Sequence, residues 1–247
     1  MTLEEIEKLE KPAIIKQWTE HLAQMKFLTN EAICQYQIQQ YSVAQLKYDE
    51  LIKHLLSMLD FVNLLQKTKP DEIVEMNPAD NLFKKNSQKK FITEIIMEIS
   101  NSYTNFGNCL LFQYEPKINK PTHAYLTAIQ WDNSNHYAKN NILHCMDVVS
   151  AHLAAAMVRR KRTPQIEAWA RNQNLGYDEL KHRNLELAYR YYNNAINIFP
   201  NEAVSWHGLG LSLCQNKTDE AIDCWMKVLE LEPNYNFELR YTVQFAD

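Results

Sequence analysis

The sequence predicts an all-α fold for the whole chain. With 4 Gly and 8 Pro among 247 residues, the turn-forming residues that a sheet-rich fold needs are scarce. Apolar residues recur at three- and four-residue spacing over most of the chain, as they do on the buried face of a helix. One set of intervals occurs twice near the C-terminus, which indicates a repeated helical unit.

The part before the repeat is predicted to be a helical bundle, residues 1–164. Helical stripes begin near Pro12, near Ile33 and at Phe91, and a further stripe runs from Ile142 to Met157. The basic run RRKR at 159–162 closes this last helix, where cations meet the negative end of the helix dipole. The polar stretch 67–90 is the longest predicted loop. Within 108–133, NCLLFQYEP is compatible with a helix or a short strand, and Pro121 begins a helix that runs to Trp131.

Charge and cysteine usage limit the classes of function. The net charge of −4, from 26 basic and 30 acidic residues, is too balanced for a nucleic-acid or membrane surface. Residues 165–247 carry 7 basic and 12 acidic side chains, an excess of acid that favours a basic partner. Five cysteines without a CxxC pair and an acidic N-terminus predict a cytoplasmic protein with no cleaved signal.

The repeated intervals lie in the last third of the chain. Residues spaced 4, 3 and 5 apart occur twice: first Ala188, Tyr192, Ala195 and Pro200, then Ala221, Trp225, Val228 and Pro233. A Leu-Gly pair precedes each set, at 175–176 and at 209–210. Two matches of four positions indicate two copies of one helical hairpin, residues 165–247, which we expect to pack on the bundle.

This pattern resembles the tetratricopeptide repeat family, whose motif is W-x2-L-G-x2-Y, then A-x3-F, then P. Asn172 stands where the motif has its Trp, with Trp169 close by. The resemblance implies two helical hairpins, in which Gly176 and Gly210 allow close helix packing. After Pro233, the stretch NFELRYTVQFAD, residues 236–247, is expected to form a helix that caps the last hairpin.

The resemblance also implies a function, since members of the family bind polypeptides. Ligands lie along a concave face lined by the first helix of each hairpin. On this chain that partner-binding face would include the following residues: Gln173, Tyr177, Lys181, His207, Leu211 and Gln215. The expected protein is an adaptor, chaperone or assembly factor that binds another protein or peptide, without a cofactor or a catalytic step.

A metal-dependent enzyme is the alternative hypothesis. Three helices carry acidic and histidine side chains at three- or four-residue spacing, which places each pair on one helix face. The candidate ligands are Glu50, His54, Glu94, Glu98, His144 and Asp147. In this alternative the bundle holds a metal or cofactor and the repeats recruit the substrate. The spacing of di-iron proteins, Glu-x-x-His, occurs only at Glu179 and His182, outside the bundle.

Overall fold

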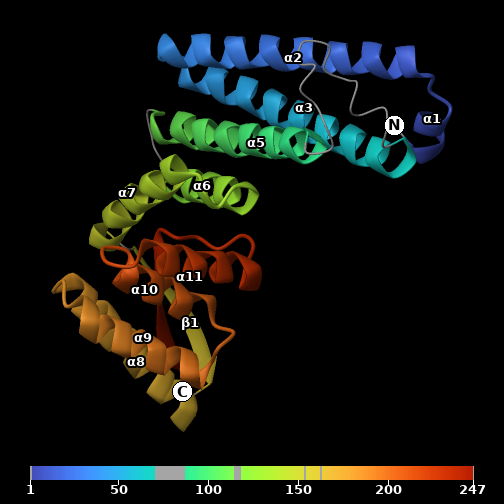
Figure 1. The fold of residues 1–247 in the computed structure, drawn as a ribbon. Coiled ribbons are helices and arrows are strands. Elements are labelled where there is room, and N and C mark those ends of the chain that lie inside the picture. The colour runs from blue at the N-terminus through green and yellow to red at the C-terminus, as the bar shows by residue number, and fades with distance from the viewer. Residues whose placement is uncertain (1, 70–86, 114–117, 153, 162, 247) are drawn as a thin grey trace. The chain divides into compact units, whose positions relative to one another are not determined.

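The computed structural model describes residues 2–69, 87–113, 118–152, 154–161 and 163–246. The chain divides into two compact units, the first made of residues 1–116 and 127–135, and the second of residues 117–126 and 136–247. Helices make up most of each unit (Figure 1), so the all-α prediction is confirmed. The sequence-based division at residue 164 differs, because residues 117–126 and 136–164 group with the hairpins.

The first unit is built from long helices that pack in chain order. Its helices are α1 (Leu3–Glu7), α2 (Lys11–Gln37), α3 (Tyr41–Thr68) and α5 (Ser87–Leu111). The side chain of Thr2 accepts a hydrogen bond from the backbone N–H of Glu5, whose carboxylate accepts one from the backbone of Thr2. This capping box starts α1. α3 packs against both α2 and α5. Of the predicted loop 67–90, residues 70–86 lie outside the described residues.

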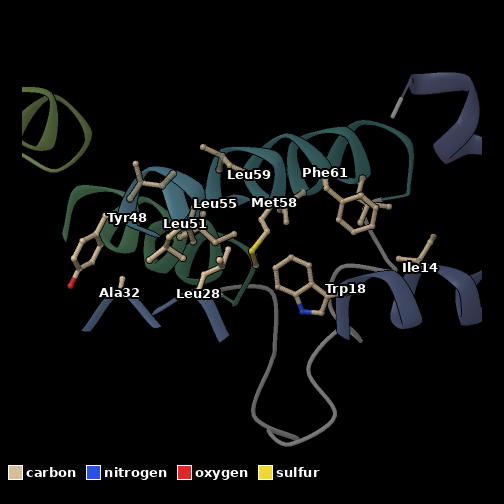
Figure 2. Packing of buried hydrophobic residues seen from close by; sticks show 14 of the residues in the cluster. Ile14, Trp18, Leu28, Ala32, Tyr48, Leu51, Leu55, Met58, Leu59 and Phe61 are labelled. Carbon is tan, nitrogen blue, oxygen red and sulfur yellow. The ribbon is translucent and has the colours of Figure 1, made fainter. Parts of the chain in front are cut away.

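The apolar stripes of these helices meet in one core, part of which is drawn in Figure 2. The rings of Trp18 and Phe61 stack with centroids 6.4 Å apart and planes 6° apart. Trp18 on α2 is 1% exposed, and Met58 on α3 is fully buried. Burial of these large side chains between facing helices holds the helices of the first unit together.

The second unit contains two helical hairpins. They are formed by α8 (Pro164–Lys181) with α9 (Leu185–Ile198), and by α10 (Ala203–Leu213) with α11 (Thr218–Leu231). α10 also packs on α9, which joins the hairpins. The unit further includes the first half of α6 (Asn119–Trp131) and α7 (His136–His152). The helix predicted from Pro121 to Trp131 is confirmed, and it begins two residues earlier.

Glycines allow two aromatic rings to lie directly against helix backbones. A Cβ added at Gly176 would come within 2.9 Å of the Tyr192 ring. A Cβ at Gly208 would come even closer to the other edge of the same ring. Gly210 lies in the same way against the indole of Trp225. The Tyr192 ring on α9 therefore lies between α8 and α10, and any larger residue at these glycines would push the helices apart.

Two strands replace predicted helical segments. β1 (Ala154–Lys161) and β2 (Leu239–Ala246) pair in parallel, with Ala154 opposite Leu239 and Lys161 opposite Ala246. The predicted C-terminal capping helix is therefore wrong. Residues 239–245 alternate apolar and polar in sequence, which is the period of a strand and not of a helix.

The prediction that RRKR closes a helix is also wrong. α7 ends at His152, and residues 159–161 belong to β1, while Arg162 lies outside the described residues. The alanines at 154–156 favour a helix locally. Their pairing partner is about eighty residues away in sequence, so local propensity could not reveal the parallel ladder. In this ladder the backbone N–H and C=O groups bond to β2 and not to a helix of their own.

We predict that Gly208→Ala destabilises the protein by about 1–3 kcal/mol, because the added methyl group overlaps the Tyr192 ring. The overlap outweighs the gain in helix propensity of about 1 kcal/mol from Gly to Ala. Urea denaturation measures the change. In a Tyr192→Leu background the same substitution should cost less, and an equal cost in both backgrounds would contradict the contact.

Arg183 ends α8 with a left-handed backbone, at φ 58°. Its N–H bonds the carbonyl of Leu180, and the N–H of Asn184 bonds that of Glu179, which is the Schellman arrangement that favours glycine. We predict that Arg183→Gly raises the free energy of unfolding by about 1 kcal/mol. Arg171→Gly, the same exchange within the helix, should lower it by a similar amount. Thermal unfolding of both variants checks this, and a loss of stability in Arg183→Gly would refute it.

Candidate functional site

The first helices of the two hairpins, α8 and α10, are joined by a buried polar contact. Ser205 on α10 is fully buried, and its Oγ accepts a hydrogen bond from Trp169 Nε1 at 3.1 Å. The side-chain amide of Gln173 donates to the same oxygen. A hydroxyl oxygen has two lone pairs for two such donors. Trp169 and Gln173 therefore hold α8 against α10. We call the surface of these two helices that carries the predicted partner-binding residues the α8–α10 face.

The structure places the six predicted partner-binding residues in two groups. Four are buried, with exposed fractions of 5%, 7%, 2% and 2%: Gln173, Tyr177, His207 and Leu211. Lys181 and Gln215 are exposed. Lys181 Nζ lies 4.9 Å from the centre of the Tyr177 ring, close enough for a cation–π contact. The resemblance to the repeat family could not show that most of these six residues are buried.

The chain's own segment 235–238 covers the α8–α10 face at His207. Tyr235 and Phe237 are both fully buried. Their ring centroids lie 5.4 and 5.3 Å from that of His207, and 5.1 Å from each other. All three pairs are edge-on, the arrangement that aromatic rings favour. The three rings thus form one packed cluster between α10 and the segment that follows α11.

α6 holds the same segment from a second direction. The carbonyl of Tyr235 lies 2.9 Å from His123 Nε2, and the N–H of Phe237 donates to Asn119 Oδ1 at 2.9 Å. The backbone N–H of Asn119 donates to the carboxylate of Glu238, also at 2.9 Å. Asn119 is the first residue of α6, where backbone N–H groups favour an anion. Polar groups of α6 therefore bind the main chain of 235–238.

His207 is held in its neutral form. Burial lowers its pKa from 6.5 to about 3, because the charged imidazolium would lose its hydration. Its Nδ1 lies 3.1 Å from the hydroxyl of Tyr235, and its Nε2 has no hydrogen-bond partner among the described residues. A neutral imidazole amid aromatic rings and main-chain contacts is suited to binding an apolar segment.

The six candidate metal ligands belong to two units, with His144 and Asp147 in the second and the other four in the first. Glu50, Glu94, His144 and Asp147 are exposed, and Glu50 pairs with Lys47 at 3.1 Å. His54 Nε2 lies 2.9 Å from the carbonyl of His21, and burial raises the pKa of Glu98. Among the residues that the structure describes, no three His, Cys, Asp or Glu side chains gather as a metal site requires.

A groove of about 730 Å³ lies between α2 and α3, and sequence analysis did not identify it. Its lining is mixed polar and apolar: Gln17, His21, Lys53, Leu56, Ser57, Asp60, Phe61, Asn63, Leu64 and Lys67. The pKa of His21 is lowered by burial and by the neighbouring His54, against an opposing effect of Glu20. Lys53 is paired with Asp49 at 2.6 Å. No single ligand chemistry follows from this lining.

Sequence analysis missed the residues that cover the α8–α10 face. His123 lies in the predicted helix Pro121–Trp131 but was given no partner, and Phe237 was assigned to the predicted capping helix. One pattern could have revealed that no helix begins here: Tyr235 and Phe237 begin an alternation of apolar and polar residues that continues to Phe245, and this spacing is not that of a helix.

Comparisons with known proteins identify no family. No family model matches the sequence, and no curated protein matches it. One solved structure that matches is the TPR2AB domain of yeast Sti1 in its pHSP90 complex, at 15% identity and a TM-score of 0.29. The match covers 87% of this chain and 80% of that one. Likeness at this level carries no argument. In the described part of the chain, no helix is long and apolar enough to span a membrane.

We predict that His207 makes the protein less stable as pH falls from about 6.5 toward 3. In this window the unfolded chain binds a proton that folded His207 does not, so each pH unit costs roughly 1.4 kcal/mol. Urea midpoints between pH 7 and 5 should therefore fall more steeply for the wild type than for His207→Gln. Both chains keep His21, which controls for its lowered pKa. Equal slopes would show that His207 is not buried as described.

Proposed function

We propose that this protein binds another polypeptide through the α8–α10 face and acts as an adaptor, chaperone or assembly factor. The observation that carries this proposal is the segment 235–238, a stretch of polypeptide that already packs on this face at His207 of α10, with both aromatic side chains fully buried. A surface that buries two aromatic side chains of one segment so completely has the shape and chemistry to bind those of another. No covalent step is required.

The hairpins support this proposal through their rigidity. Tyr192 lies against Gly176 and Gly208, and Ser205 is bonded from α8. Two first helices fixed side by side offer a preorganised surface, which lowers the entropy cost of binding. Lys181 is the last residue of α8 and Gln215 follows the end of α10 by two residues. Both are exposed and would form the polar rim of the interface.

A cytoplasmic location belongs to the proposal as well. All five cysteines are free in the structure: Cys34, Cys109, Cys145, Cys214 and Cys224. Burial raises the pKa of Cys109, Cys145 and Cys224 to about 12, so these thiols stay protonated and unreactive. Unpaired thiols in the core are compatible with a reducing compartment.

We predict that the protein, purified under native conditions from its own source, carries a polypeptide that an amine-reactive cross-linker joins to Lys181. Mass spectrometry of the linked peptides identifies the site. Changing Lys181 and Gln215 together to Glu should reduce recovery of the partner about tenfold, equivalent to about 1.4 kcal/mol.

The control is Arg190→Glu, an exposed change on the second helix α9 that should leave recovery unchanged. Absence of any polypeptide partner, or a partner whose cross-links all lie outside α8 and α10, would contradict the proposed function.

A further inference from the structure

The segment 235–238 has the features of a bound ligand. Its sequence is Tyr-Asn-Phe-Glu, and the aromatic side chains at its first and third positions are fully buried. Glu238 N–H donates to Asn236 Oδ1 at 3.0 Å, which fixes the turn between the segment and β2. Each position of the segment thus has a distinct local environment.

The surroundings of the segment distinguish side chains from main chain. The rings of Tyr235 and Phe237 pack edge-on against His207, and Phe237 also contacts the ring of His123 at 5.6 Å. The main chain is bound by His123 and Asn119. Because main-chain contacts are independent of sequence, the ring pockets determine which peptides fit.

The acidic residue at the fourth position has its own partner. Glu238 accepts from the first N–H of α6 at 2.9 Å, and a carboxylate is favoured at a helix N-terminus. The site therefore favours an acidic residue after the second aromatic one. This differs from the basic partner that the excess of acidic residues in 165–247 suggested.

We propose that the site between α6 and α10, at His207 on the α8–α10 face, recognises an aromatic-x-aromatic-acidic segment of a partner protein, and that residues 235–238 occupy this site in the free chain as an internal competitor. This inference rests on the proposed function and specifies its partner and its regulation. A ligand tethered within the same chain acts at a high effective concentration. A partner binds only in the fraction of molecules whose site is open, so its apparent affinity falls by that fraction.

The test uses the full-length chain and a fluorescent peptide that spans residues 232–239, EPNYNFEL. A matched peptide has Ala at both aromatic positions. Binding is measured by anisotropy for the wild type and for Tyr235→Ala/Phe237→Ala, which removes the internal competitor and leaves α6 and α10 intact. A second variant, Glu238→Lys, weakens the competitor without emptying the ring pockets, and Glu232→Lys is its charge-matched control because Glu232 is exposed.

We expect the double variant to bind EPNYNFEL at least about tenfold more tightly than the wild type does, as a site more than 90% occupied requires. Glu238→Lys should shift in the same direction and Glu232→Lys should not. The alanine peptide should not bind. Circular dichroism confirms that each variant is folded, and if the double variant unfolds, the Glu238→Lys comparison decides.

Equal affinity in the wild type and the variants would overturn the proposal, as would a folded variant that binds neither peptide or both peptides equally. If such a result is found while a partner is still cross-linked at Lys181, the internal competitor and the recognition motif are refuted, and the proposed binding function stands. Absence of that cross-linked partner is the separate result that would refute the proposed function.

Discussion

The second unit depends on the close approach of helix backbones to the ring of Tyr192. Gly176 and Gly208 supply surfaces without a Cβ on the two sides of this ring, and only then can α8, α9 and α10 pack at their observed separation. The polar contact at Ser205 requires the same separation, because Trp169 and Gln173 reach it from α8. The α8–α10 face is a consequence of this packing.

The chain covers that face at His207 with its own residues 235–238, and this contact links the fold to the proposed function. α11 ends at Leu231 and β2 begins at Leu239, so the intervening residues have to cross the unit. They do so over His207, where burial of two aromatic side chains contributes roughly 1.5–3 kcal/mol each. The same burial excludes water from His207 and keeps it neutral. A partner that binds there has to replace these contacts with equivalent ones.

Much of the helical architecture was predictable from sequence. Helical spacing located α2, α3 and α5, and the repeated intervals located the hairpins because Ala188, Tyr192 and Trp225 are fixed by packing at those intervals. Gly208 was missed, since the motif highlights Gly210 in the same helix. Two rings require two glycines on α10, one for Tyr192 and one for Trp225.

The site was less predictable, for a physical reason. Gln173, Tyr177, His207 and Leu211 were placed on a shared face by the resemblance to the repeat family, but that resemblance describes the hairpins and not the segments that pack on them. The covering residues come from α6 and from the segment after α11, about 110 residues apart in sequence. Similarly, β1 could not be predicted from alanines that favour a helix when its stabilising partner is β2.

The central claim is that the chain's own residues 235–238 lie on His207 in the free protein. Nuclear Overhauser spectroscopy of the free, full-length chain tests it most directly, because the ring centroids of Tyr235 and Phe237 lie 5.4 and 5.3 Å from that of His207. We expect cross-peaks from the His207 ring to the rings of both Tyr235 and Phe237. A folded protein that lacks both cross-peaks, with the two aromatic rings in a solvent-exposed environment, would contradict the account.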